Sequence, residues 1–261
     1  MTRSTLLCPP IFYDIVYSIN PWMQGAKVDK ALAMQQWFQL KNILSHIGVN
    51  IKLIDQSPDL PDMTFTANAG TVRDNAVVLS NFKHPVRQGE TEHFREWFRK
   101  EGYNIHPLPP NAIFEGTGDT VICDDLLIGG YGFRSNLTGL RMAAEILDLE
   151  LLPLKLTNPN FYHLDTCFAL LRPDLGLYYP GAFSAYTISK LKKHMELIPV
   201  SESSANKFVC NSIVHNGVII MPAGNEEVAD KLEGYGFSAR LINTSEFLKS
   251  GGSLKCMSLW I

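Results

Sequence analysis

The chain has 261 residues, of which 46% are hydrophobic and 19% are charged, and its formal net charge is −3. Such a composition is typical of a globular protein with a sizeable core, and the length suits one domain spanning residues 1–261. The slightly acidic balance argues against a nucleic-acid-binding protein, because phosphate backbones require a basic surface.

The apolar run from Leu6 to Ile19 is broken by Pro9, Pro10 and Asp14, so it does not predict a signal peptide. No segment approaches the roughly 20 apolar residues of a membrane span. The five cysteines are scattered and odd in number, which favours neither a disulfide framework nor a metal site. We therefore expect a cytoplasmic protein with reduced thiols, no metal and no cofactor, and at least one thiol kept for its reactivity. The sequence leaves the oligomeric state open, a homo-oligomer included.

A supersecondary unit recurs along the chain: a polar opening, a β-rich run, a turn, a second apolar run and a helix. The first unit opens at Asp62, with predicted strands at 65–72 and 76–79 and a predicted helix at 89–102. Later units open near residues 115, 163 and 206. Their predicted strands are 120–123, 126–129, 166–171, 177–179, 208–214 and 218–221, and their predicted helices are 140–149, 185–195 and 226–235.

The fifth unit is split between the two ends of the chain. A strand at 255–261, an N-terminal strand at 11–19 and a helix at 30–47 are predicted to form it. The openings are roughly 40–55 residues apart, a period typical of repeated supersecondary units. Such units can close into a ring of blades with a central pocket, although the spacing alone leaves the number of blades open.

Polar residues gather where the predicted strands begin, and a ring of repeats would bring them to one axis. Cys256 follows Gly251 and Gly252, whose backbone freedom permits close approach to a ligand. His163 and Asp165 are two residues apart and would share one face of a strand, a pairing suited to an acid/base partner for a thiolate. A buried structural cysteine and a core histidine bonded to an aspartate are equally compatible with these patterns.

Glu115 and Asp119 lie among small residues in Phe-Glu-Gly-Thr-Gly-Asp, at 114–119. A carboxylate matches a guanidinium in a two-pronged fork, so this segment is a candidate site for a cation, with a solvated polar turn as the alternative. Weaker candidates for substrate contacts are Asp62, Asn68, Asn20, Arg87 and Arg134. Either arginine is a candidate ligand for a substrate carboxylate.

Taken together, residues 114–119, 163–166 and Cys256 resemble, in the same order, the motifs of the guanidino-group modifying superfamily, also called the amidinotransferase or pentein family. Four further segments, 19–23, 65–70, 131–135 and 179–183, resemble its arginine dihydrolase branch. The resemblance implies an α/β propeller of five ββαβ blades around a central active-site pocket. It also implies a nucleophilic Cys256, with His163 as acid/base and Glu115 and Asp165 gripping the guanidinium.

The dihydrolase branch converts arginine to ornithine, carbon dioxide and two ammonia through a covalent thiouronium intermediate, and the resemblance implies the same reaction here. An arginine deiminase or a dimethylarginine dimethylaminohydrolase, either of which stops at citrulline, is the alternative within the enzymes. A catalytically silent arginine-binding protein is the alternative of another class. Asn68 stands where the better-known members carry an aspartate, and a neutral amide suits the neutral ureido intermediate of a second hydrolysis.

Overall fold

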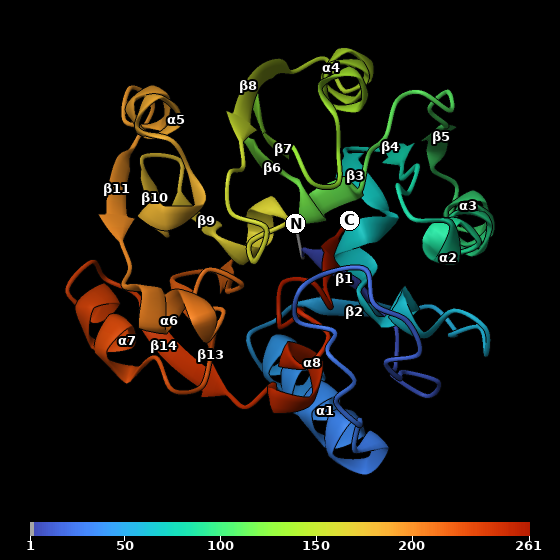
Figure 1. The fold of residues 1–261 in the computed structure, drawn as a ribbon, viewed down its shortest axis with the longest axis horizontal. Coiled ribbons are helices and arrows are strands. Elements are labelled where there is room, and N and C mark those ends of the chain that lie inside the picture. The colour runs from blue at the N-terminus through green and yellow to red at the C-terminus, as the bar shows by residue number, and fades with distance from the viewer. Residues whose placement is uncertain (1–2) are drawn as a thin grey trace.

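In the computed structural model, which describes residues 3–261, the strands form five three-stranded sheets arranged as blades around a ring, with the longer helices on the outside (Figure 1). Within each blade the first two strands are antiparallel, and the third strand follows a helix and runs parallel to the second. This ββαβ arrangement confirms the expected five-bladed α/β propeller.

Four blades follow in chain order. Their strands are β3 (Gly70–Arg73), β4 (Ala76–Leu79) and β5 (Asn104–His106), then β6 (Thr120–Cys123), β7 (Leu126–Tyr131) and β8 (Glu150–Lys155), then β9 (Phe168–Arg172), β10 (Leu175–Tyr178) and β11 (Glu196–Pro199), then β12 (Ile213–His215), β13 (Val218–Pro222) and β14 (Ser238–Ile242). The helices are α1 (Lys30–His46), α2 (Pro85–Gln88), α3 (Glu90–Lys100), α4 (Leu137–Ile146), α5 (Ala185–Leu191), α6 (Glu202–Asn206), α7 (Glu226–Glu233) and α8 (Ser245–Leu248).

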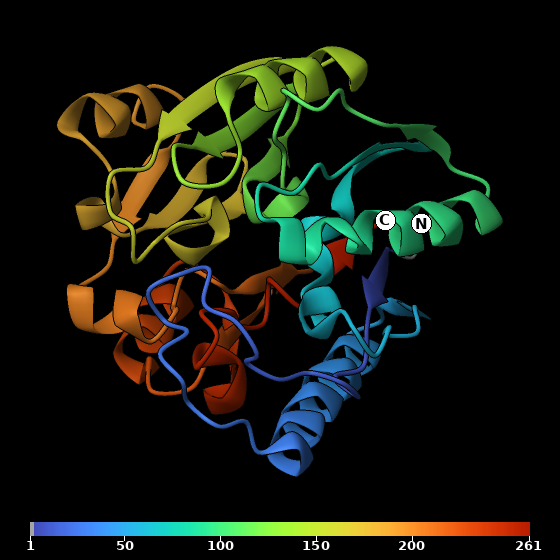
Figure 2. The same ribbon diagram turned by 45° about the vertical axis from the view of Figure 1, so that its right-hand side comes forward.

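The fifth blade closes the ring by joining segments from both ends of the chain. Strand β1 (Ser4–Leu7) pairs antiparallel with β15 (Leu259–Trp260) and parallel with β2 (Asn50–Leu53). The two ends therefore lie side by side near the centre of the ring (Figures 1 and 2). This blade has the same strand order as the others, so the prediction that it is split between the chain ends is confirmed.

The outer helices pack against their own sheets through one apolar face. In α3, Phe94 and Phe98 are one helical turn apart and both are fully buried. The hairpin turns place Asp74, Asp124 and Asn216 at φ of 52°, 52° and 48°, a left-handed conformation that short polar side chains tolerate. The helices begin and end within a few residues of the predicted limits, and the longest, predicted at 30–47, spans 30–46.

Several predicted strands are shorter than expected at their inner ends. The chain forms tight 3₁₀ turns at η2 (Thr66–Ala69) and η4 (Leu164–Thr166), so the predicted strands 65–72 and 166–171 begin only at β3 and β9. The predictions 208–214 and 255–261 shrink in the same way to β12 and β15. At some of these places the backbone bonds to a neighbouring blade, as where the Ala67 N–H donates to the Cys256 carbonyl at 3.0 Å.

The predicted strand at 11–19 is wrong. This segment forms no strand, and Ile11, Phe12 and Val16 are exposed; the strand that completes the blade lies earlier, at β1. The two prolines that follow β1 supply no backbone donor for a sheet, so the chain leaves the blade there. Across residues 3–261, no helix is both long enough and apolar enough to cross a bilayer.

Candidate active site

Five short segments, here called the inner turns, precede the first strand of each blade and meet at the ring axis: residues 66–69, 116–119, 163–167, 209–212 and 253–258. Their backbones bond to one another, as in the Lys255 N–H that donates to the Asn211 carbonyl at 3.3 Å. Gly118 is required for this packing, because a Cβ there would lie 2.2 Å from the Nδ2 atom of Asn68. The inner turns thus bring together side chains that are far apart in the sequence.

Cys256 is buried between two side chains from other blades. Its Sγ atom lies 3.2 Å from Oδ2 of Asp165 and 3.0 Å from Nδ2 of Asn211. Burial and, next, the negative charge of Asp165 raise the pKa of the Cys256 thiol well above its ordinary value. In the absence of a ligand the thiol is therefore protonated and donates its hydrogen to Asp165.

His163 belongs to a buried hydrogen-bonded network with Glu115 and Arg134. Nε2 of His163 lies 2.8 Å from Oε2 of Glu115, and the same oxygen accepts from Nη1 of Arg134 at 3.0 Å. Burial opposes ionisation of Glu115, but the Arg134 charge and the His163 hydrogen bond prevail and hold its pKa well below the ordinary value. Glu115 is thus an anion, and its hydrogen bond fixes the orientation of the imidazole of His163.

The expectation that His163 and Asp165 share one face of a strand is wrong. His163 is the N-cap of η4, and Asp165 lies inside that 3₁₀ turn. The turn directs His163 toward Glu115 and Asp165 toward Cys256. The two residues still flank the cysteine, but a tight turn places them there.

Cys256 and His163 line a small cavity, with about 10 Å³ of free space, roughly enough for one water. Asp62, from the short helix η1 (Pro61–Thr64), also lines it, and its Oδ1 atom has no hydrogen-bond partner within residues 3–261. Burial raises the pKa of Asp62. The remaining lining residues are Ile19, Met23, Phe65, Asn68, Arg87, Arg134, Tyr162, Ser250, Gly251 and Gly252.

Asn68 and Arg87 are bonded to each other in this cavity. Oδ1 of Asn68 accepts from Nη1 of Arg87 at 3.0 Å, and Nδ2 of Asn68 donates to the Glu115 carbonyl at 3.1 Å. Arg87 also forms a two-pronged pair with Glu90, at 2.7 and 2.9 Å. These partners fix the orientation of the Asn68 amide, which has one further N–H to offer.

Two of the predicted substrate ligands, Asp119 and Asn20, do not line this cavity. Asp119 accepts from the backbone N–H groups of Ser135 at 2.9 Å and Leu164 at 3.2 Å, so it braces the segments that carry Arg134 and His163. Asn20 donates to the Ser250 carbonyl at 2.9 Å and thereby fastens the N-terminal segment over the cavity. Both side chains hold the walls of the site in this structure.

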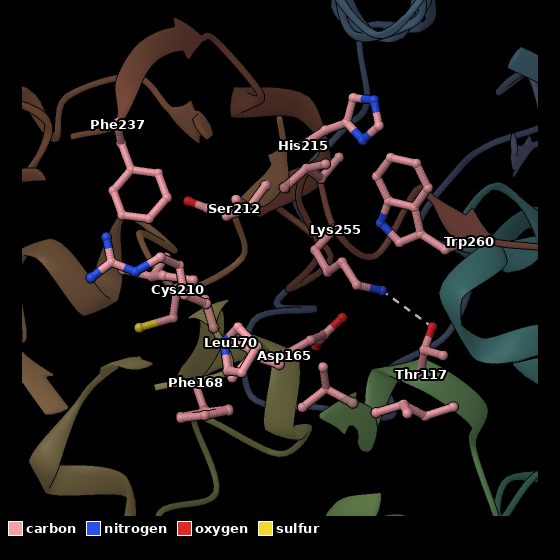
Figure 3. A pocket seen from close by; sticks show the side chains of 18 of the residues that line it. Thr117, Asp165, Phe168, Leu170, Cys210, Ser212, His215, Phe237, Lys255 and Trp260 are labelled. Carbon is pink, nitrogen blue, oxygen red and sulfur yellow. Dashed lines mark hydrogen bonds between the residues drawn. The ribbon is translucent and has the colours of Figure 1, made fainter. Parts of the chain in front are cut away.

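A larger cavity, of about 590 Å³, lies on the other side of the inner turns. Figure 3 shows Asp165 and Lys255 in it, with the Lys255 amine reaching Thr117 at 3.2 Å. Cys256 does not line this cavity, although its neighbour Lys255 does. The size of a cavity is therefore no guide to the candidate reactive centre, because of these two cavities within residues 3–261 it is the smaller one that Cys256 lines.

Asn211 contacts the sulfur of Cys256 directly and is not among the site residues predicted from the sequence. Asn211 stands two residues before the first strand of its blade, and Asn68 stands at the same distance before β3. Aligning the units on their first strands would have revealed this correspondence. The predicted strand 208–214 runs through residue 211, where the structure has a turn that ends before β12.

The comparisons with known proteins agree with this geometry. The family model described as N,N-dimethylarginine dimethylhydrolase, eukaryotic, matches residues 18–261. The chain belongs to this family. It also belongs to the wider guanidino-group modifying superfamily, as the resemblance of its motifs implied. The expected absence of a cofactor stays a prediction.

Two curated relatives of this family member bear the names of different hydrolases. The bifunctional arginine dihydrolase/ornithine cyclodeaminase AgrE of Nostoc sp. is 41% identical over 97% of this chain and 37% of that protein. The N(G),N(G)-dimethylarginine dimethylaminohydrolase of Mycobacterium tuberculosis is 34% identical over 100% of this chain and 86% of that protein. The chain thus spans little more than a third of the bifunctional relatives.

A solved structure resembles this one closely. It is a variant of the N-terminal domain of ArgZ covalently bound to a reaction intermediate, with a TM-score of 0.96 and 39% identity over 99% of this chain and 97% of that one. The five-bladed fold is therefore shared with a domain that forms a covalent intermediate.

Proposed function

We propose that this chain is a cysteine-dependent hydrolase that converts arginine to ornithine, carbon dioxide and two ammonia. The observation that supports this most is the position of Cys256, whose sulfur lies between Asp165 and Asn211. His163, which is paired with Glu115, lines the same cavity as Cys256. The likeness to the arginine dihydrolase domain of ArgZ, at 39% identity, favours arginine as substrate.

In this proposal the substrate activates its own nucleophile. The resting thiol is protonated because it is buried beside Asp165. A guanidinium that enters between Asp165 and Asn68 neutralises the carboxylate and brings a positive charge to the sulfur, which favours the thiolate. We expect no metal or other cofactor to be needed, because the substrate supplies this charge.

The first C–N cleavage proceeds through a covalent intermediate. The thiolate of Cys256 attacks the guanidinium carbon, and the imidazolium of His163 gives its proton to the departing ammonia. A thiouronium on the sulfur remains. The neutral imidazole then takes a proton from a water molecule, which attacks the same carbon and releases citrulline and the cysteine. Glu115 holds His163 in position throughout.

A second cycle removes the ureido group. Cys256 attacks the ureido carbon, a second ammonia leaves, and the thiocarbamate that results is hydrolysed to a carbamate, which loses carbon dioxide to give ornithine. Asn68 is suited to this step, because its remaining N–H can donate to the neutral ureido oxygen. This free donor supports our account of why an asparagine stands here in place of an aspartate.

The amino-acid end of the substrate has two candidate partners. Asp62, with an unpartnered oxygen within residues 3–261, is the candidate for the α-ammonium group. Arg134 is a better candidate than Arg87 for the α-carboxylate, because it uses fewer of its five N–H groups in the bonds of the described residues. We infer further that residues 1–261 act as one cytoplasmic catalytic domain. The proposal leaves the oligomeric state open, and a homo-oligomer is compatible with it.

The test is stoichiometric. The protein is incubated with L-arginine, and ammonia, citrulline and ornithine are quantified. Two ammonia per ornithine with little citrulline support the dihydrolase. One ammonia per citrulline makes the chain a deiminase, and dimethylamine released from dimethylarginine makes it a dimethylaminohydrolase like the mycobacterial relative. Binding of arginine without any product would instead favour the silent binding protein.

A further inference from the structure

Asn211 is fully buried in the inner turn of the fourth blade, and every polar group it has is bonded. Its backbone N–H donates to the Phe208 carbonyl at 2.8 Å, and its carbonyl accepts from the Lys255 N–H at 3.3 Å. Phe208, at φ 58°, holds a conformation that is costly for a bulky residue. Packing therefore outweighs the local backbone preference of the chain and fixes the turn that directs Asn211 toward the axis.

The side chain of Asn211 grips Cys256 at two atoms. Its Oδ1 atom accepts from the Cys256 backbone N–H at 3.2 Å, and its Nδ2 atom donates to Sγ at 3.0 Å. The second hydrogen of Nδ2 goes to the Asp165 carbonyl at 3.1 Å. A flipped amide would place its NH₂ group against the N–H and its oxygen against the carbonyl, so the backbone partners fix the donor toward the sulfur.

The two side-chain neighbours of the sulfur have opposite effects on its proton. The Asp165 carboxylate accepts the thiol hydrogen and so stabilises the neutral form. The Asn211 N–H group needs an acceptor, and a thiolate is a better acceptor than a thiol. Removing the amide while leaving Asp165 would therefore make the thiolate harder to form.

We propose that Asn211 is a positioning residue that holds the Cys256 backbone in place and stabilises the thiolate through its Nδ2–H···Sγ hydrogen bond. The inference rests on the proposed function only in taking Cys256 as the nucleophile. It adds a group from the fourth blade to a site that otherwise draws on the first, second, third and fifth.

Other ionisable groups also act on the Cys256 thiol, and the test must separate them from Asn211. Asp165 and Lys255 flank it with opposite charges, His163 lines the same cavity, and the Tyr162 hydroxyl donates to the Gly251 carbonyl nearby. The further charged residues of the cavity are Asp62, Arg87 and Arg134. A substitution at Asn211 leaves all of these unchanged.

The experiment measures alkylation of Cys256 by iodoacetamide from pH 6 to 9.5, with Cys256→Ala as the background for the other thiols. Asn211→Leu keeps the approximate shape and removes all three side-chain hydrogen bonds, and Asn211→Asp keeps the acceptor for the Cys256 N–H but removes the donors to the sulfur and to the Asp165 carbonyl. We expect both to lower the rate at pH 7.5 about tenfold or more, which corresponds to about one unit in the thiol pKa. A purely structural role would be rescued by Asn211→Asp.

Ser212→Ala is the matched control, because Ser212 is the buried neighbour whose hydroxyl donates only to the Val209 carbonyl, at 2.6 Å, among the described residues. It should alkylate within twofold of the unmodified protein. A rate for Asn211→Asp within twofold of the unmodified protein overturns the proposed role of Asn211. If a cationic haloacetamidine, which brings the charge that the substrate would supply, also labels unmodified Cys256 no faster than the background, the proposed function fails as well, so the two failures are distinguishable.

A second measurement needs no variant of Asn211. In protein labelled with ¹⁵N at asparagine side chains, one buried amide signal should shift with the Cys256 titration and should lose that shift in Cys256→Ala. If no asparagine side-chain signal follows the thiol, the inference is overturned even if the Asn211 variants do not fold.

Discussion

Replacing Asn68 by aspartate tests whether a neutral amide lets the enzyme complete the second hydrolysis. The variant keeps an acceptor for Nη1 of Arg87, which lies 3.0 Å from Oδ1, but it loses both amide hydrogens. One of these bonds the Glu115 carbonyl at 3.1 Å, and we assign the other to the ureido oxygen. Losing a hydrogen bond and leaving a buried acceptor unpaired costs about 1–3 kcal/mol.

The lost hydrogen bond weakens binding of the ureido intermediate. It does not weaken binding of the cationic substrate, because an added carboxylate attracts a cation. At about 1.4 kcal/mol per factor of ten, the ratio of ornithine to citrulline should fall about 5- to 150-fold. The assay quantifies both products from L-arginine within the first turnovers. Asn225→Asp is the control, because Asn225 is buried and bonds the Pro222 carbonyl at 3.0 Å, away from the catalytic cavity. An Asn68→Asp ratio within twofold of the unmodified protein, or an equal shift in the control, refutes the reasoning.

Three further predictions concern the nucleophile and its supports. Cys256→Ala should retain a cooperative unfolding transition while turnover drops below about one part in a thousand, and higher residual activity would contradict a covalent role. Asp119→Asn removes the acceptor from one of two backbone N–H groups, so we expect the free energy of unfolding to fall by about 1–2 kcal/mol and the Tm by about 2–8 °C. The KM for arginine should change less than about twofold. A large rise in KM at unchanged Tm would instead indicate that Asp119 binds the substrate. Burial and Asp165 raise the pKa of Cys256, so the rate of alkylation by uncharged iodoacetamide should keep rising above pH about 8.5. A cationic haloacetamidine should react readily at lower pH. If the iodoacetamide rate reaches a plateau below pH about 8.5, the resting thiol is already ionised.

The outer parts of each blade could be predicted from local sequence, and the inner parts could not. The helix beginning at Lys30 and the turn at Asn216 follow from periodicity and turn chemistry, which act over a few residues. The third strand of each blade was missed, because these strands are short and partly exposed, as in 50–53 and 238–242, and show no clean alternation. Each of these third strands is positioned by parallel pairing with the second strand of its blade, from which a helix separates it in the sequence.

The candidate site shows the same division. Cys256 and His163 stood out because their residue types carry chemistry, and the structure brings both to one cavity. Asn211 gave no such signal, since its role arises from a turn that bonds a residue 45 positions away. The bracing roles of Asp119 and Asn20 could not be predicted from the sequence either. A carboxylate or an amide gives the same sequence signal whether it contacts a ligand or the protein backbone.

The pairing of β1 with β15 has a consequence for the order of events during synthesis. Strand β1 can pair with β2 once both have been synthesised, but it has no inner neighbour until residues 259–260 emerge. Cys256 lies in the turn directly before that strand, so the sulfur reaches Asp165 and Asn211 in the same step that closes the ring. A nascent chain with four finished blades would thus hold Asp165 and Asn211 without Cys256 between them, and the proposed site would be complete only when β1 pairs with β15.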